Sequence, residues 1–285
     1  MRRLAATLLL AAIAPAAGAE EWRPCPQCPP MVRIPAGQSV MGDDKAKFAN
    51  EKPAVKVTIP RPFALSASEI TFDEWQACVD ANSCKGGQDD HTWGKGRRPV
   101  INMTWDEARA YAAWVGRESG LVCRLPSEAE WEHAARSGAA TGYWWGEDAG
   151  KGRLNCRDCL GKEPPYGSQP VRSFPPSPWG LYEMHGNVWE WTSDCWTPDH
   201  SKPPSADPAC RDKVVKGGSW YYFSAMSRAS ARAKNDAMVW SYNIGVRVLC
   251  ELPEGFRPAG GTPALQPDLG ARASRPHITP SRPAP

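Results

Sequence analysis

The sequence has little excess charge, few histidines and a single long apolar run. Its net charge of +3 is too small to favour binding to nucleic acid or to an acidic membrane surface. After the N-terminal segment no apolar run is long enough to span a bilayer. The five histidines show no H-x-x-x-H spacing, and no G-x-S-x-G pattern marks a nucleophilic serine. These absences argue against nucleic-acid binding, a membrane span and a standard serine hydrolase.

The N-terminal segment MRRLAATLLLAAIAPAAGA has a basic start and an apolar stretch. Ala17-Gly18-Ala19 then forms a small-x-small cleavage site. This pattern predicts a secretory signal peptide over residues 1–19 and a periplasmic or secreted protein. An uncleaved N-terminal anchor is the alternative.

Ten cysteines fit an exported chain, because an even number in an oxidising compartment indicates disulfides. Neighbours along the chain are Cys25/Cys28, Cys78/Cys84, Cys156/Cys159 and Cys195/Cys210. Cys123 and Cys250 remain and could close a long loop. Two of the neighbouring pairs are C-x-x-C, a spacing that zinc sites also use, so zinc is the competing interpretation.

Capping boxes predict three helices, starting at Thr71, Thr104 and Ser127, each with a glutamate three residues later. Short strands are predicted at Met31–Ile34, Ser39–Met41, Val55–Ile59, Val214–Val215 and Val246–Leu249. The chain from Trp144 to Lys216 is predicted to be mostly loop. We expect a Pro-rich lead at 20–30, one α+β domain at 31–252 and a Pro-rich disordered tail at 253–285.

Six segments, in this order, resemble the sulfatase-modifying-factor family, whose founding member is the formylglycine-generating enzyme. They are MVRIPAGQSVMGDD, PVINMTWDEARAYAAWV, CRLPSEAEWEHAARSG, GLYEMHGNVWEWTSD, VVKGGSW and NIGVRV. Relatives act in ergothioneine synthesis and in maturation of the siderophore pyoverdine. The resemblance implies a loop-rich α+β fold related to C-type lectins, stabilised by disulfides and by calcium.

The resemblance also implies calcium ligands in a segment where carboxylates lie among tryptophans. Glu183, Gly186, Val188 and Glu190 match one family calcium site, and calcium prefers such carboxylate and carbonyl oxygens. A second site maps onto Asn155, Cys156, Glu163 and Pro165. Tryptophans between the ligands are expected to pack into the core. A solvated loop without an ion is the alternative.

The family's copper centre is where this chain departs from the pattern. The formylglycine-generating enzyme binds copper through two cysteines shortly after its GGS motif. Here these positions hold Tyr222 and Ser227, which cannot replace thiolates for Cu(I). Whether the chain binds copper or iron is therefore left open. The loop histidines His91, His185 and His200 would be the ligands if the fold brings them together.

Other positions of the family's substrate groove persist. By resemblance Trp189, Ser219 and Asn243 would bind substrate, and Tyr222, Ser227 and Arg228 are the candidate catalytic residues. The alternative is a purely structural role, in which these residues only shape turns and loops.

Two functions of different class follow. The first is an exported oxidoreductase or maturation factor that acts on a peptide or peptide-like substrate without the copper cysteine pair. The second is a non-catalytic, lectin-like binding or scaffold module that binds an envelope protein.

Overall fold

The computed structural model describes residues 20–159, 166–205 and 207–258. The predicted signal peptide, most of the predicted tail and the predicted calcium ligands Glu163 and Pro165 lie outside the described residues.

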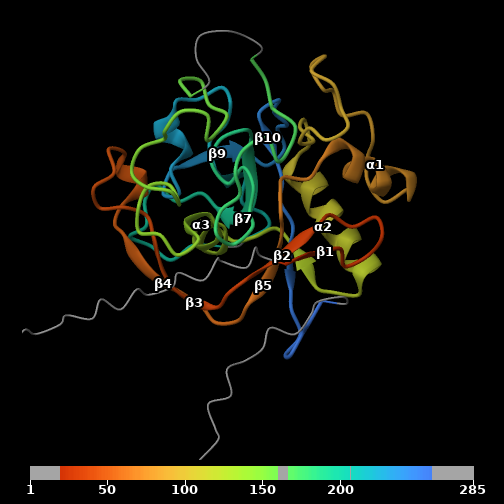
Figure 1. The fold of residues 1–285 in the computed structure, drawn as a ribbon, viewed down its shortest axis with the longest axis horizontal. Helices are drawn as coiled ribbons and strands as arrows, with labels where there is room; N and C mark the ends of the chain where they lie inside the picture. The colour runs from red at the N-terminus through yellow and green to blue at the C-terminus, as the bar shows by residue number, and fades with distance from the viewer. Residues whose placement is uncertain (1–19, 160–165, 206, 259–285) are drawn as a thin grey trace, which may run out of the picture.

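Three α-helices begin where the capping boxes predict them. They are α1 (Phe72–Asp80), α2 (Trp105–Ser119) and α3 (Glu128–Arg136). At each start the cap hydroxyl accepts a hydrogen bond from the third backbone amide, and the glutamate there accepts one from the cap amide. Figure 1 shows α1 and α2 together on one side of the molecule, with α3 beside β7 in the other half.

Two sheets and a hairpin form the β structure. The first sheet is antiparallel and has the order β1 (Glu21–Trp22), β2 (Met31–Ile34), β5 (Phe63–Ser66), β11 (Leu249–Glu251), β6 (Cys123–Arg124). The second has the order β10 (Ile244–Gly245), β7 (Trp189–Cys195), β8 (Asp212–Lys216), β9 (Arg232–Asp236). Strands β3 (Gly37–Met41) and β4 (Val55–Ile59) pair separately. The 3-10 helices are η1 (Ala49–Glu51) and η2 (Ser224–Ser227). Since β1 pairs with β2, the lead predicted at 20–30 contributes to the first sheet.

Two strand predictions need correction. Strand β7 lies inside the region predicted to be mostly loop; all its residues except Ser193 are buried, so it shows no polar–apolar alternation. The strand predicted at Val246–Leu249 is divided. β10 ends at Gly245 in one sheet and β11 begins at Leu249 in the other, so the apolar residues between them cross from sheet to sheet.

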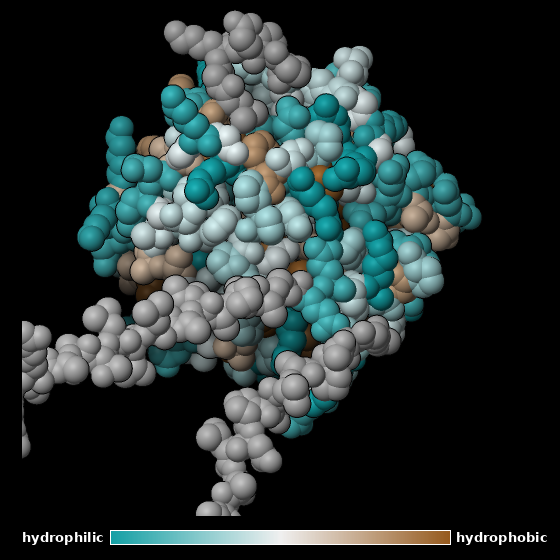
Figure 2. Space-filling view, in the orientation of Figure 1, coloured by the Kyte–Doolittle hydropathy of each residue, from teal (hydrophilic) through white to brown (hydrophobic). Residues whose placement is uncertain are grey.

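Two apolar clusters make up the core. The larger contains the buried faces of α1 and α2 with Trp189 and Trp191, and the smaller surrounds Trp131 on α3. Trp189, which lies between the predicted calcium ligands Val188 and Glu190, is 2% exposed, as expected of a tryptophan packed into the core; Trp191, just after the last ligand, is 0% exposed. Figure 2 shows hydrophilic residues over most of one face, with apolar residues in small patches.

All ten cysteines are paired in five disulfides, and no free cysteine remains. The four neighbouring pairs form as predicted, and Cys123 bonds Cys250 directly across the β6–β11 pairing. The zinc interpretation is therefore wrong for these cysteines, because disulfide sulfurs are not thiolate ligands. No helix of the described chain is long and apolar enough to cross a bilayer.

Candidate functional site

The structure brings four of the predicted groove residues together. Trp189 begins β7, and its amide donates a hydrogen bond to the carbonyl of Asn243 (2.8 Å). The amide of Tyr222 donates to the carbonyl of Ser219 (3.0 Å). The rings of Trp189 and Tyr222 lie edge to face, with centroids 5.7 Å apart. The ladder of β7 and the turn after β8 therefore place these four residues at one point.

Tyr222 is the member of this group that reaches solvent. Its exposed fraction is 40%, whereas Trp189, Ser219 and Asn243 are buried. Partial burial raises the pKa of Tyr222, and the nearby tyrosines Tyr242 and Tyr221 raise it further. The phenol therefore stays protonated at neutral pH and can donate a hydrogen bond to a ligand.

Tyr222 belongs to a larger set of touching rings, which we call the aromatic surface: Trp93, Trp220, Tyr221, Tyr222, Phe223 and Tyr242. Successive centroid distances of 5.1 Å (Trp93 to Trp220), 5.5 Å (Trp220 to Tyr221) and 5.5 Å (Tyr221 to Tyr222) link the set. Phe223 and Tyr221 share the guanidinium of Arg157, which lies 5.3 and 5.9 Å from their ring centroids. Tyr221, Tyr222 and Phe223 are the exposed members of this set, and exposed rings of this kind suit contact with a peptide or with another ring system.

Ser227 and Arg228 do not join this surface. Ser227 is fully buried, and a Cβ at Gly218 would overlap its hydroxyl, so it lies beneath the GGS turn. The guanidinium of Arg228 is bound to Glu51 (2.6 Å) and to Ser230 (3.1 Å). The buried carboxylate of Glu51 needs a cation, which explains why Arg228 turns away from the groove.

The three loop histidines do not meet. His91 lies between Trp93 and Tyr242, and His200 lies 3.7 Å from a Glu128 oxygen. Nδ1 of His185 bonds the carbonyl of Ser227 (2.7 Å), and burial lowers the pKa of its ring to about 4. Across the described residues, the one cluster of metal-ligand atoms is Cys156, Asp158 and Cys159. The prediction of an iron or copper site from these histidines is therefore wrong.

The family's copper centre does not fit the residues that are present. Every cysteine is part of a disulfide, and the two thiol positions hold a tyrosine and a serine. A phenol and an alkyl hydroxyl are hard donors, whereas Cu(I) selects soft sulfur.

The first predicted calcium site is rich in buried oxygen. Glu183 accepts hydrogen bonds from the amides of Arg172 (2.9 Å) and Phe174 (3.2 Å). Glu190 accepts from Arg247 Nε (2.8 Å) and from the indole of Trp131 (2.6 Å). Both carboxylates are almost completely buried, so their remaining lone pairs face the interior.

A third carboxylate, Glu69, was not predicted at this place. It lies fully buried before α1 and accepts from the amide of Val188 (3.3 Å). Burial raises the pKa of Glu69 well above its ordinary value, and the charge of Glu183 raises it further. Burial likewise raises the pKa of Glu183 and Glu190. The sequence feature that could have indicated a buried carboxylate here is that Glu69 is a lone acidic residue among small and apolar ones.

The three carboxylates share one buried cation, Arg247, so when ionised they carry two uncompensated negative charges. A divalent cation would neutralise that excess, and the donors are all oxygen, which calcium prefers. These carboxylate oxygens do not form one ligand cluster in the described chain, and each oxygen of Glu183 and Glu190 already has a protein hydrogen-bond partner. Calcium held by Glu183, Glu190 and the carbonyls of Gly186 and Val188 therefore stays a prediction, with the buried negative charge in its favour.

The second predicted site adjoins the first. The carbonyl of Asn155 accepts from the amide of Asn187 (2.8 Å), and a Cβ at Gly186 would overlap that carbonyl. Gly186 has φ +83°, so glycine satisfies both the backbone angle and the close approach. Asn155 and Cys156 therefore pack directly against the first predicted calcium loop.

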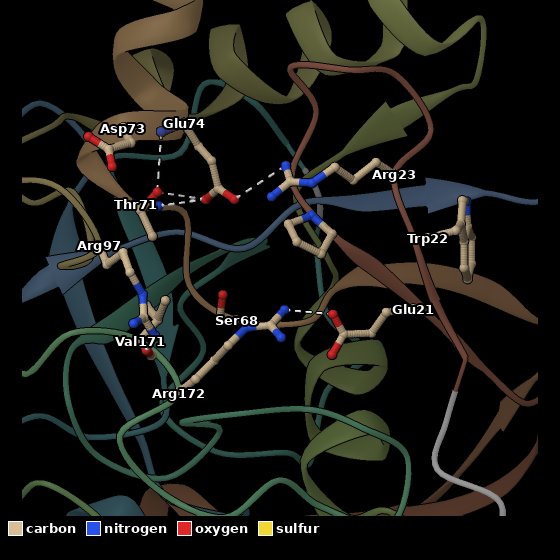
Figure 3. A pocket seen from close by; sticks show the side chains of 11 residues that line it. Glu21, Trp22, Arg23, Ser68, Thr71, Asp73, Glu74, Arg97, Val171 and Arg172 are labelled. Atoms are coloured by element: carbon tan, nitrogen blue, oxygen red, sulfur yellow. Dashed lines mark hydrogen bonds and ion pairs between the residues drawn. The ribbon is translucent and has the colours of Figure 1, made fainter.

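A separate pocket of about 530 Å³ opens at the start of α1, and none of the predicted site residues lines it. Figure 3 shows its charged lining, in which Arg172 pairs with Glu21 (2.6 Å) and Arg23 faces Glu74 (4.0 Å). Because these charges largely pair among themselves, the pocket presents no strong excess of either sign.

The described chain is a loop-rich, disulfide-stapled α+β protein of the formylglycine-generating-enzyme fold. Residues 18–252 match the model of the family described as sulfatase-modifying factor enzyme 1-like domain. The chain therefore belongs to the sulfatase-modifying factor family.

Three proteins illustrate which members of the family this chain is similar to. The formylglycine-generating enzyme of Mus musculus is 35% identical, and the match covers 76% of this chain and 74% of that protein. The inactive C-alpha-formylglycine-generating enzyme 2 of Mus musculus is 29% identical, over 78% of this chain and 85% of that protein. The structure is also similar to PvdO from Pseudomonas aeruginosa, with a TM-score of 0.74 and 31% identity, covering 82% of this chain and 99% of the other.

Proposed function

We propose that this chain is an exported maturation factor that binds a peptide or peptide-like substrate on the aromatic surface and promotes its oxidation. The observation that carries the proposal is the contact between Trp189 and Tyr222. The family's groove residues stay together there, while a phenol replaces the first copper thiol. Similarity to PvdO over nearly its whole length supports a place in the same branch of the family.

The residues of the groove have distinct parts in the proposal. The ring of Trp189 forms the buried floor, and Tyr222 supplies a half-exposed ring and a hydroxyl donor. Ser219 and Asn243 hold these two through their backbone carbonyls. Together they would orient a substrate and exclude water from one side of it.

Export is part of the proposal. The predicted signal peptide and five disulfides support it, because disulfides persist in oxidising compartments. Calcium in the proposal is a structural ion at Glu183 and Glu190, supported by the buried negative charge described above.

A second candidate is a non-catalytic binding module of the envelope. The pairing of all ten cysteines favours it, since no thiolate is left for the family's copper chemistry. Similarity to an inactive member of the family is in line with it.

One experiment separates the two functions. The purified chain is mixed in air with two probes, a cysteine-containing peptide and a pyoverdine-type peptide siderophore precursor. Binding is followed by fluorescence anisotropy and the product by mass spectrometry. We expect a probe to bind and to lose two hydrogens, whose two electrons and two protons pass to dissolved oxygen, and we expect this loss to be slower in the same mixture without the chain.

Variants link the result to the groove. Tyr222→Ala should weaken binding about tenfold, the scale expected for losing one well-packed aromatic contact. Phe48→Ala, which removes an exposed ring outside the aromatic surface, should leave binding unchanged. Binding without any mass change would favour the module, and no binding of either probe would contradict the proposal.

A further inference from the structure

Beside the groove lies a second group of chemistry-bearing side chains, Cys156, Asp158 and Cys159, whose ligand atoms lie within 4.8 Å of one another. The two cysteines form a disulfide with two residues between them. This C-x-x-C spacing lets the second thiol resolve a mixed disulfide formed by the first. We propose that Cys156–Cys159 is a redox-active disulfide that oxidises a dithiol peptide held on the aromatic surface.

The loop that carries the disulfide is bonded directly to the aromatic surface. The amide of Arg157 donates to the carbonyl of Tyr222 (2.9 Å). The amide and hydroxyl of Ser224 donate to the two oxygens of Asp158, at 2.7 and 3.0 Å. The sulfur pair is therefore held against the same short segment in which the resemblance places the first copper thiol.

The exposed part of this loop is the pair of residues between the cysteines, while the cysteines themselves are largely buried. Arg157 and Asp158, between the cysteines, are exposed, and Cys159 retains 8% of its surface. The neighbouring rings of Tyr221 and Phe223 are 44% and 56% exposed. A peptide bound on these rings would thus lie beside the loop that carries the disulfide.

The disulfide adds little to the stability of the fold. Loop-closure entropy rises with the logarithm of loop length, so a disulfide across two residues constrains the unfolded chain least. Its sulfurs belong to a small satellite cluster with Tyr143 and Leu154, separate from the two main clusters. Reduction would therefore disturb only local packing, which a cycling disulfide requires.

Cys25–Cys28 provides a matched control within the same chain. It has the same spacing, its Cα–Cα distance of 5.0 Å is close to the 5.1 Å of Cys156–Cys159, and the second cysteine amide bonds the first carbonyl at 3.1 Å in both loops. Cys25 is as exposed as Cys159, at 8%, so the two pairs differ in position and not in exposure: Cys25 and Cys28 belong to the main core, and Arg23 donates a hydrogen bond to the carbonyl of Cys28.

The exchange balances without a metal. One peptide thiol attacks the sulfur of Cys159, forming a peptide–Cys159 disulfide and releasing Cys156 as a thiol. The second peptide thiol attacks the mixed disulfide, which forms the peptide disulfide and releases Cys159. Two electrons and two protons pass from the peptide to the two cysteines, and a small-molecule disulfide such as oxidised glutathione reverses the change.

The inference rests on the proposed function only for the position of the bound peptide. The first experiment uses no peptide and so does not depend on the proposed function. Wild-type chain is equilibrated under native conditions with reduced and oxidised glutathione over a series of ratios. Thiols are then alkylated and mapped by mass spectrometry. We expect Cys156–Cys159 to be reduced at a glutathione ratio at least tenfold less reducing than Cys25–Cys28. Reduction of both pairs at the same ratio would overturn the inference.

The second experiment tests the oxidation itself. A synthetic peptide with two cysteines is mixed with an equal amount of oxidised chain in the absence of air. Wild type should form one peptide disulfide per chain, Cys25→Ser/Cys28→Ser should match it, and Cys156→Ser/Cys159→Ser should be at least tenfold slower. Equal rates for all three would overturn the inference.

A groove variant keeps the two proposals apart. If Tyr222→Ala slows peptide oxidation and leaves the glutathione equilibrium unchanged, both the groove and the disulfide are supported. If it changes neither, the groove proposal fails while the redox-active disulfide stands.

Discussion

At the scale of single residues, buried charge is the property that most distinguishes this chain. Glu128 at the start of α3 is paired with Arg232 (2.7 Å) and lies 3.5 Å from Lys216. Burial alone would raise the pKa of Glu128, but Lys216, His200 and Arg232 lower it to about 2. Removing Arg232 would leave Glu128 with Lys216 as its remaining cation, and breaking a buried ion pair by removing one partner typically costs about 3–5 kcal/mol.

Asp194, next to this network, has a raised pKa, whereas the pKa of Glu128 is lowered. Its carboxylate accepts a hydrogen bond from the amide of Glu128 (2.6 Å), yet burial raises its pKa from the ordinary 3.8 to about 6. Between these values the folded chain binds the proton more tightly than the unfolded chain. The contribution of Asp194 to stability is therefore full below about pH 3.8 and is lost as the pH rises through about 6.

The prediction is that wild type loses up to about 3 kcal/mol relative to Asp194→Asn between pH 4 and pH 7. Urea unfolding at a series of pH values measures the difference. Asp148→Asn, at an exposed position, should keep the wild-type profile. Parallel profiles for wild type and Asp194→Asn would contradict the assignment.

At the scale of elements, the loop before β7 depends on partners from distant segments. Glu183 is held by two amides of the 172–174 segment, and Asn187 bonds Glu69 from the other side (2.9 Å). Three buried carboxylates near Arg247 are the basis for the proposed calcium ion in this loop. An ion that binds only the folded state raises the free energy of unfolding by mass action.

We therefore predict that millimolar calcium raises the Tm of the purified chain by several degrees over the same sample in chelator, because calcium at 100 times its Kd adds about 2.7 kcal/mol. Glu190→Gln should reduce this calcium-dependent difference, whatever its own stability. Glu251→Gln, an exposed change on β11, should keep the difference. A wild-type Tm that is the same in calcium and in chelator would rule out the ion.

At the scale of the whole molecule, the two ends of the domain are tied together. Strand β11 lies between β5 and β6 in the first sheet, and the Cys123–Cys250 disulfide joins it to β6 across a sequence separation of 127. The segment between β10 and β11 also connects the two sheets. The C-terminal strands thus hold the sheet that carries the groove against the sheet beneath α1 and α2.

Removing this disulfide should cost more than removing a short-range one. Loop-closure entropy predicts about 5 kcal/mol for Cys123→Ala/Cys250→Ala and about 2 kcal/mol for Cys25→Ala/Cys28→Ala. Chemical denaturation of the two double variants under identical conditions measures both values. A smaller loss for the long-range pair would show that native packing, and not the unfolded chain, sets the cost.

The sequence by itself determined the features that depend on neighbours along the chain. Each capping box is complete within four residues, so the starts of α1, α2 and α3 were predictable from Thr71, Thr104 and Ser127. Four of the disulfides join near neighbours, and the six family segments indicated the fold. The absence of the copper thiols was also plain, because it needs only the identity of residues 222 and 227.

Tertiary structure decided what depends on contacts between distant segments. Strand β7 carries no alternating pattern because both of its faces are buried. Glu69 comes near Glu183 and Glu190 only in the folded chain, where Asn187 and the amide of Val188 donate hydrogen bonds to it. Arg228 follows the groove in sequence, yet the buried Glu51 draws its guanidinium elsewhere. Likewise, the place of Cys156–Cys159 beside Tyr222 depends on hydrogen bonds that no local pattern specifies.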